Sequence, residues 1–170
     1  STISTGSSRP WCTTSSPMSS TWWRSRPGPG CPWLHRSSPS AIARAVTGGL
    51  EQGGVLPVLK HIPGHGRATA DSHFRLPTVD APREELERTD FAAFQPLADL
   101  PMAMTAHVVF SALDPAQPAT TSATIIRQVI RGVIGFQGLL MSDDVSMNAL
   151  AGSIAERTRA IVNAGCDMVL

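Results

Sequence analysis

The sequence lacks the features that mark several large classes of protein. It has no basic block, because 14 Lys and Arg residues balance 13 Asp and Glu residues for a formal charge of +1, so nothing predicts binding to nucleic acid or to an anionic membrane. No apolar run approaches the roughly 18 residues that span a bilayer. The cysteines, Cys12, Cys31 and Cys166, are scattered and odd in number, which argues against a disulfide framework and a zinc knuckle.

A secretory signal is missing as well, since the N-terminus has no charged start followed by an apolar core. We therefore expect a cytoplasmic protein with neither a nucleic-acid nor a membrane partner. The length of 170 residues fits about one domain of globular size.

Acidic residues are absent from the first fifty positions. No Asp or Glu precedes Glu51, and all four tryptophans lie within residues 1–40, among Ser, Thr, Pro and Arg. This segment shows neither a helical nor a strand period. We interpret it as an out-of-frame reading or a misassigned start; a disordered linker is the alternative, although such linkers are usually poor in Trp and Cys. Residues 41–170 form the second part of the chain, with ordinary composition.

Helices alternate with apolar runs throughout this second part. The predicted helices cover 41–50, 82–97 with a break near Thr89 or Pro96, 122–133 with a cap at Thr121 or Ser122, and 154–164; the predicted strands cover 55–59, 102–109, 139–142 and 166–170. Continuously apolar strands are typical of a parallel sheet covered on both faces. The pattern predicts α/β architecture, and about four strands correspond to an incomplete, C-terminal portion of a (β/α)8 TIM barrel.

Ionisable residues stand at the ends of these predicted strands. Lys60 and His61 follow the first strand, His107 lies near the end of the second, and Asp143 and Asp144 follow the third. The carboxyl ends of the strands carry the active site in a (β/α)8 barrel and the ligand crevice in an open α/β sheet. The pattern therefore predicts a functional site rather than surface charges that serve solubility.

The loop after the first strand allows two kinds of chemistry. His61 and His65 are four residues apart, which would present a metal pair on a helix, but the Pro-Gly pair between them disfavours a helix. Asp71 and His73 allow a second kind, because a carboxylate that accepts the imidazole N–H fixes the tautomer and leaves the other nitrogen for proton transfer. A surface turn capped by Asp71 is the structural alternative.

Asp143 adds a nucleophile to this arrangement. A carboxylate at the end of a buried strand can attack an electrophilic carbon while the imidazole of His73 protonates the departing oxygen. The neighbouring Asp144 is a candidate helix cap, or a residue that holds Asp143 in position.

Four motifs occur together in one order: KHIPGHG over 60–66, DSH over 71–73, MTAH over 104–107 and SDDVSM over 142–147. In this combination the sequence resembles the family 3 glycoside hydrolases of the bacterial β-N-acetylhexosaminidase type, over about residues 41–170. The resemblance implies a TIM barrel, a retaining mechanism and a cytoplasmic enzyme that removes terminal N-acetylglucosamine from peptidoglycan fragments carrying anhydro-N-acetylmuramic acid.

The resemblance also implies a role for individual motif residues. Asp143 corresponds to the nucleophile that forms a glycosyl-enzyme, His73 to the general acid/base, and Asp71 to the dyad partner of His73. Lys60 and His61 resemble the pair that hydrogen-bonds the sugar. We expect no cofactor and no metal, and a small-molecule carbohydrate, an N-acetylglucosaminyl anhydromuropeptide, as the substrate.

Two other functions stay open at this point. One is a metal-dependent hydrolase that uses a cluster of four side chains, His61, His65, Asp71 and His73, and the other is a non-catalytic remnant that associates with another chain. The strands that precede residue 55 in the family are missing or replaced here, and a barrel without about half of its strands has two open edges and an unfilled interior. We therefore expect the chain as written to be unstable or inactive.

Overall fold

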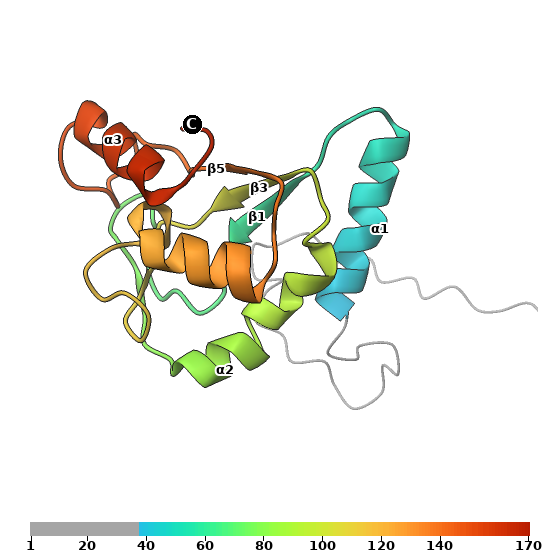
Figure 1. Cartoon of the computed structure of the whole chain (residues 1–170), viewed down its shortest axis with the longest axis horizontal. Coiled ribbons are helices and arrows are strands. Elements are labelled where there is room, and N and C mark those ends of the chain that lie inside the picture. The colour runs from blue at the N-terminus through green and yellow to red at the C-terminus, as the bar shows by residue number, and fades with distance from the viewer. Residues whose placement is uncertain (1–37) are drawn as a thin grey trace, which may run out of the picture. The chain divides into compact units, whose positions relative to one another are not determined.

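The computed structural model describes residues 38–170, in which helices and strands alternate (Figure 1). The helical elements are α1 (Ser38–Gln52), α2 (Arg83–Arg88), the 3₁₀ turns η1 (Phe91–Ala93), η2 (Gln95–Leu97) and η3 (Ala119–Thr121), the π-helix η4 (Ile125–Val133) and α3 (Ile154–Ala164). The strands are β1 (Val58–Ile62), β2 (Thr78–Val79), β3 (Met102–Thr105), β4 (Val109–Phe110) and β5 (Leu139–Met141). The predicted α/β character is confirmed. Of the irregular segment predicted over residues 1–40, positions 1–37 lie outside the described residues.

Three strands form a parallel sheet in the order β1-β3-β5. Met102 at the start of β3 is level with Val58 of β1 on one side and with Leu139 of β5 on the other. Because the strands run in one direction from a common level, their carboxyl ends meet at one end of the sheet. The residues that follow β1 and β5 are therefore brought close together, although about 80 positions separate them in the sequence.

A bulge interrupts β1 shortly before the strand ends. The pairing with β3 shifts register between Leu59 and Ile62, so that Lys60 and His61 together stand opposite a single residue of β3, Met104. An extra residue of this kind bends the strand and changes the direction in which its side chains point. The first two residues of the KHIPGHG motif, Lys60 and His61, lie on this bulge.

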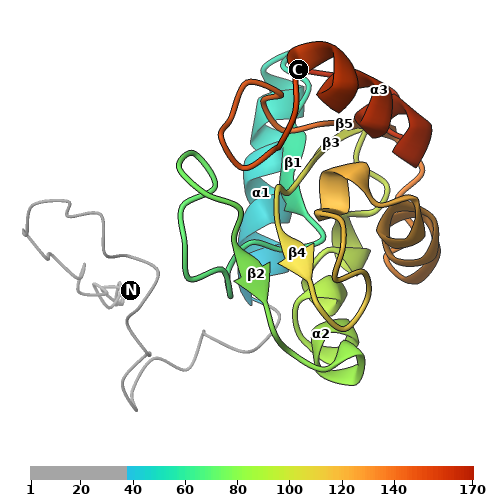
Figure 2. The same ribbon diagram turned by 90° about the vertical axis from the view of Figure 1, so that its left-hand side faces the viewer.

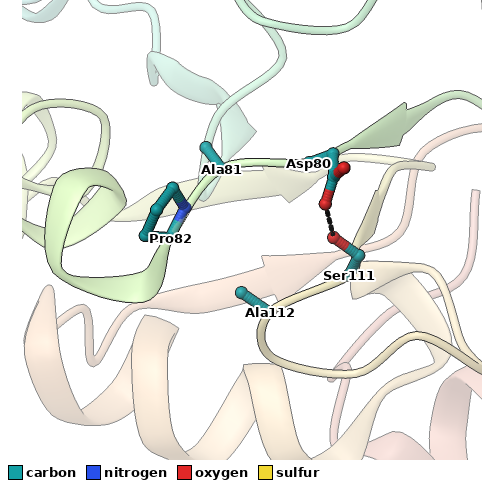
Figure 3. A pocket seen from close by; sticks show the side chains of 5 residues that line it. All are labelled: Asp80, Ala81, Pro82, Ser111 and Ala112. Atoms are coloured by element: carbon teal, nitrogen blue, oxygen red, sulfur yellow. Dashed lines mark hydrogen bonds between the residues drawn. The ribbon is translucent and has the colours of Figure 1, made fainter.

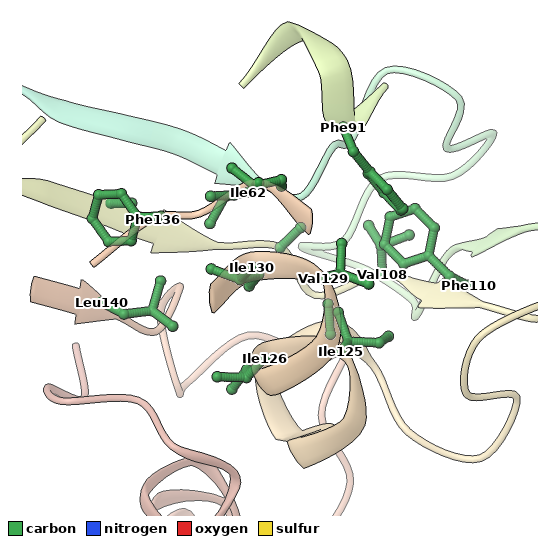
Figure 4. Packing of buried hydrophobic residues seen from close by; sticks show 14 of the residues in the cluster. Ile62, Phe91, Val108, Phe110, Ile125, Ile126, Val129, Ile130, Phe136 and Leu140 are labelled. Carbon is green, nitrogen blue, oxygen red and sulfur yellow. The ribbon is translucent and has the colours of Figure 1, made fainter. Parts of the chain in front are cut away.

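The hydrophobic core lies between this sheet and η4 (Figure 4). Ile62 of β1 and Leu140 of β5 are completely buried there, and so is Phe136 in the connection to β5. The buried side chains that η4 contributes are Ile125, Ile126, Val129 and Ile130. Each such side chain stabilises the folded chain by about 1.5–3 kcal/mol relative to exposure, and together they fix η4 against the strands that carry the polar residues.

Two predicted helices have well-defined ends. The backbone N–H of Ile125 donates to the Ser122 hydroxyl at 3.1 Å, which agrees with the predicted cap, but η4 is wound more widely than an α-helix because Ile134 N–H bonds the carbonyl five residues back. Helix α3 begins with a reciprocal capping box between Ser153 and Glu156 and ends at Gly165, whose φ is 110°. The predicted end of this last helix is confirmed.

The predicted boundaries of the first strand were wrong. The run 55–59 begins outside the sheet, because Val55 N–H bonds the Leu50 carbonyl at 2.9 Å as part of the turn that ends α1. The strand β1 instead begins at Val58 and continues through Ile62. Lys60 and His61 thus lie within the last part of the strand and not after it.

The predicted second and fourth strands are also corrected. The run 102–109 divides into β3 and β4, because β4 leaves the main sheet and pairs with β2. The run 166–170 makes a single parallel bridge, between Met168 and Met141, in place of a full strand. The predicted third strand, 139–142, is one residue shorter as β5, so that Ser142 is the first residue after it.

Strands β2 and β4 form a separate parallel pair that periodicity did not predict (Figure 2). An open hollow of about 500 Å³ lies where these strands end (Figure 3), and its lining residues are Asp80, Ala81, Pro82, Ser111 and Ala112. The Ser111 hydroxyl donates to the Asp80 carboxylate at 2.6 Å. None of the predicted catalytic residues lines this hollow, so it does not mark the site predicted from the motifs.

Residues 38–170 contain no closed barrel, since the main sheet has three strands. Large apolar side chains of α1, Ile42, Val46 and Leu50, are 63%, 57% and 40% exposed. An apolar helix face of this kind is ordinarily covered in a folded domain. The predicted α/β class is therefore present, whereas the barrel appears here only as a partial sheet with its helices. Within the described range, no helix has the length and apolarity that crossing a bilayer requires.

Candidate active site

Asp143 lies two residues beyond β5, and its carboxylate is held from two sides. Its side chain is only 13% exposed. Oδ1 accepts a hydrogen bond from the Asp144 backbone N–H at 2.9 Å, and Oδ2 lies 3.6 Å from Nε2 of His61. Ser142, the buried residue directly before Asp143, is itself held in place, because its hydroxyl accepts from the Leu170 N–H at 3.1 Å. The structure thus brings two predicted site residues, Asp143 and His61, together across β3.

His61 faces this carboxylate as a neutral ring near pH 7. Burial lowers the pKa of His61 below its ordinary value of 6.5, although the negative charge of Asp143 opposes that effect. The contact between the two side chains is therefore a polar contact and not an ion pair. A neutral imidazole has one donor and one acceptor nitrogen, both of which suit sugar hydroxyls.

Lys60 lies beside His61 on the bulge, with an exposed side chain. Its positive charge is one of the causes that lower the pKa of His61, after burial. Lys60 and His61 therefore lie together in the last part of β1, whereas the sequence predicted them just after the strand.

Asp71 and His73 form the predicted pair. The Nδ1 nitrogen of His73 lies 2.8 Å from Oδ1 of Asp71, and the same oxygen accepts the His73 backbone N–H at 2.9 Å. Both bonds lower the pKa of Asp71, and the bond from the His73 backbone N–H has the larger effect. Because the Asp71 carboxylate accepts at Nδ1, Nε2 of His73 is left as the nitrogen for proton transfer. The side chains are 58% and 72% exposed, so this pair lies on an accessible loop.

The His73 ring lies within electrostatic reach of the segment that carries the nucleophile. Hydrogen bonds from Ser146 lower the pKa of Asp144 most, and the charge of a protonated His73 adds to that effect. Asp144 itself is exposed, and its Oδ1 accepts the Ser146 N–H at 2.7 Å. Asp144 therefore shapes the turn after Asp143, in line with the predicted capping or positioning role.

Contacts of His65 and Arg67 fix the first part of the loop over residues 63–77, and the motifs alone did not reveal them. His65 Nε2 lies 3.4 Å from the hydroxyl of the buried Ser72, in the middle of the Asp-Ser-His triplet. Arg67 bonds Asp90 at 2.7 Å and Glu85 at 2.8 Å, which ties the loop to α2 and to the residue before η1. A sequence signal for these pairs is hard to find, because the partners lie up to 23 positions apart.

The four-residue metal cluster is not supported by the geometry. Residues 38–170 contain no group of three or more His, Cys, Asp or Glu side chains that could hold a metal ion. The rings of His61 and His65 are 5.8 Å apart between centroids and tilted at 57°. Asp71 is engaged with His73, and His65 with Ser72, so these donors point to protein partners and do not converge on one point.

His107, which the sequence placed near a strand end without a role, is completely buried between β3 and β4. Its Nδ1 lies 2.8 Å from the Thr120 hydroxyl, and its Nε2 lies 3.0 Å from the backbone carbonyl of Asp144. It therefore connects the strand end of β3 to the residue after the candidate nucleophile.

Comparison with known proteins identifies a family match and several similar proteins. Residues 35–170 match the glycosyl hydrolase family 3 N-terminal domain. A beta-hexosaminidase from Alkalilimnicola ehrlichii is 45% identical over 141 residues, which cover 79% of this chain and 40% of that protein. The chain spans about 40% of the length of the curated relatives it matches.

Solved structures show the same similarity. A glycoside hydrolase family 3 β-N-acetylglucosaminidase from a Paenibacillus species superposes with a TM-score of 0.73 at 36% identity, covering 77% of this chain and 26% of that one. NagZ from Neisseria gonorrhoeae, in complex with N-trifluoroacetyl-D-glucosamine, superposes with a TM-score of 0.69 at 40% identity, covering 77% of this chain and 39% of that one.

Proposed function

Because the chain belongs to glycosyl hydrolase family 3, we propose that it carries the catalytic residues of a retaining β-N-acetylhexosaminidase. The family resemblance identified from the four motifs is thereby confirmed. We propose terminal β-linked N-acetylglucosamine on peptidoglycan fragments, with an anhydromuramoyl leaving group, as the substrate, and the cytoplasm as the location. The relative whose structure contains N-trifluoroacetyl-D-glucosamine supports this sugar class.

In the first step, a carboxylate oxygen of Asp143 bonds to the anomeric carbon while the bond from that carbon to the leaving oxygen breaks. Oδ2 is the better candidate for attack, because Oδ1 already accepts the Asp144 N–H at 2.9 Å, whereas Oδ2 has only the 3.6 Å contact with His61. The imidazolium of His73 donates its Nε2 proton to the leaving oxygen, so that the product departs as a neutral alcohol.

In the second step, water attacks the anomeric carbon and the ester bond to Asp143 breaks. The neutral His73 ring accepts a proton from this water at Nε2 and so returns to its starting state. Asp71 supports both steps, because its carboxylate accepts the Nδ1 hydrogen at 2.8 Å and thus keeps Nε2 toward the reacting oxygen.

Lys60 and His61 bind the sugar in this proposal. The Lys60 ammonium offers donors only, whereas the neutral His61 ring offers one donor and one acceptor. The bulge of β1 places both residues opposite one residue of β3, next to the strand end that carries Asp143. Sugar hydroxyls bound here would lie directly beside the nucleophile.

The observation that carries the proposal is the shielded Asp143 carboxylate beside His61 at the carboxyl end of the sheet, together with the Asp71–His73 pair on the loop that follows β1. A slow fluorinated N-acetylglucosaminide that traps the glycosyl-enzyme, followed by peptide mapping, tests it. Because the chain spans only part of its relatives, the protein to use is a chimera in which residues 35–170 replace the matched stretch of the Alkalilimnicola relative.

We expect the label on Asp143 of this chimera and its loss in Asp143→Asn. Asp144→Asn is the matched control, because it changes the adjacent exposed carboxylate and should retain labelling. A label on any other residue, or an unlabelled chimera beside a labelled parent enzyme, would refute the assignment. Activity that chelators abolish would support the metal-dependent alternative instead.

We also propose that the 170-residue chain alone is unstable or inactive. The exposed apolar face of α1 and the three-stranded sheet of the described residues support this proposal. The measurement is thermal unfolding together with hydrolysis of an aryl N-acetyl-β-glucosaminide. A soluble chain that melts cooperatively and cleaves this substrate would overturn it.

A further inference from the structure

His107 is the completely buried imidazole that links β3 to the segment of the nucleophile. Its ring makes two polar contacts, at 2.8 Å from Nδ1 to the Thr120 hydroxyl and at 3.0 Å from Nε2 to the Asp144 carbonyl oxygen. Such a ring costs free energy to bury unless both nitrogens are satisfied. Both ring nitrogens of the buried His107 therefore have a polar partner.

These contacts determine the tautomer of His107. A carbonyl oxygen can only accept, so Nε2 carries a hydrogen and donates it to Asp144. Burial lowers the pKa of His107, although the hydrogen bond to Asp144 opposes this, so the ring is neutral and Nδ1 accepts. With this tautomer the Thr120 hydroxyl donates to Nδ1 at 2.8 Å, in competition with the Ala106 carbonyl at 3.0 Å, and it can accept from the Thr105 hydroxyl at 2.9 Å.

We propose that His107 is a positioning residue for the nucleophile: its Nε2–H holds the carbonyl of Asp144, and the N–H of the same Asp144 holds Oδ1 of Asp143. The two hydrogen bonds, at 3.0 Å and 2.9 Å, connect the buried His107 ring to the reacting carboxylate through the backbone of Asp144. This inference rests on the proposed function, because it takes Asp143 as the nucleophile.

Other contacts of this segment act farther along the chain. Arg157 donates to the carbonyls of Val145 and Met147, at 2.9 and 3.1 Å, and Val145 N–H bonds the Leu170 carbonyl. We expect these contacts to keep the turn folded when His107 is changed. Loss of the Nε2 donor should therefore change the orientation of the Asp143 carboxylate and leave the fold intact.

Two substitutions separate positioning from simple packing. In His107→Gln the amide N–H reaches as far as Nε2 and can still donate to Asp144, whereas in His107→Asn the shorter side chain ends near the position of Nδ1 and cannot. The pKa of His61, measured by NMR on the chimera, reports whether Asp143 has moved. The negative charge of Asp143 raises this pKa, so the pKa falls if the carboxylate moves away from His61.

Positioning therefore predicts that the pKa of His61 falls in His107→Asn and stays near the wild-type value in His107→Gln. A role in packing alone would shift it equally in both variants, because both variants remove the imidazole ring. A rise in both, or equal values in the two variants, would overturn the proposal. If neither variant folds, the ¹⁵N chemical shifts of His107 in the protein without these substitutions provide the test. We expect a hydrogen on Nε2 and none on Nδ1, because the Asp144 carbonyl can only accept; a hydrogen on Nδ1 alone would overturn the proposal.

Kinetics in the chimera provide the second readout. We expect His107→Asn to lower kcat by about 10- to 100-fold with KM changed by less than about twofold, and His107→Gln to restore most of kcat. Equal losses in both variants, or a raised KM with unchanged kcat, would contradict positioning. A chimera that is inactive without any further substitution would refute the proposed function instead, and the pKa of His61 would still decide the role of His107.

Discussion

Gly138→Ala should destabilise the protein through a clash that can be located in the structure. A Cβ at Gly138 would lie 2.5 Å from the Pro101 carbonyl oxygen, 2.7 Å from that of Leu100 and 2.8 Å from the Phe136 ring. Real Cβ atoms essentially never come within 3.0 Å, so the backbones must separate by at least about 0.5 Å to accommodate the methyl group. Two of the three obstacles are backbone atoms, which cannot rotate away. Overpacking of this kind costs about 1–3 kcal/mol.

The position of Gly138 makes this cost relevant to the site. Leu139 N–H bonds the Pro101 carbonyl at 2.9 Å, so a separation there weakens the first contact between β3 and β5. Because β5 leads directly to Asp143, we expect a lower kcat in the chimera as well as a lower melting temperature. At about 2–4 °C per kcal/mol for a domain of this size, the decrease in melting temperature should be about 2–12 °C.

The assay is thermal unfolding followed by circular dichroism, on the chain or on the chimera if only the chimera melts cooperatively. Gly49→Ala is the matched control: it lies within α1, no atom lies within 4 Å of its added Cβ, and alanine is more favourable than glycine in a helix by about 0.5–1 kcal/mol. The two substitutions should therefore act in opposite directions. A Gly138→Ala protein that melts at or above the wild-type temperature would refute the close approach of β5 to the segment before β3.

Three further outcomes are expected. Asp71→Ala should lower kcat of the chimera by about 10- to 100-fold at an unchanged melting temperature, since the exposed pair with His73 contributes little to stability; a large loss of stability would contradict this. Burial lowers the pKa of His61 and His107, so the unfolded chain binds more protons below about pH 6.5 and stability should fall as the pH drops through that range; a urea midpoint equal at pH 7.5 and 5.5 would show otherwise. Burial raises the pKa of Cys166 to about 12, so alkylation at pH 8 should modify it only after unfolding, as mass mapping would show.

Local signals in the sequence predicted those elements whose ends are determined by neighbouring residues. The capping box of Ser153 and Glu156 and the left-handed Gly165 involve partners within a few positions, and the predicted helix over 154–164 has these ends in the structure. The apolar run that became β5 was also visible, because a buried parallel strand is apolar on both faces. The placement of Asp143 just beyond that strand followed from the same pattern.

Long-range pairings could not be predicted in this way. The separation of β4 from β3 depends on pairing with β2, which lies about thirty residues earlier, and no local period distinguishes one apolar run from two. The partners of His107 are equally remote, since Thr120 is 13 positions away and Asp144 is 37 positions away. A buried histidine with two distant partners resembles, in sequence, any histidine near a strand end.

The bulge in β1 explains how one short strand serves both the core and the site. Leu59 and Ile62 are three positions apart, so in a regular strand their side chains would point to opposite faces of the sheet. The bulge pairs them with residues two apart in β3, which places both on one face, and both are buried. The two residues between them, Lys60 and His61, do not follow the regular alternation of side chains between the two faces, and both lie opposite one residue of β3. Only this extra residue lets the hydrophobic positions remain in the core while His61 comes within 3.6 Å of Asp143.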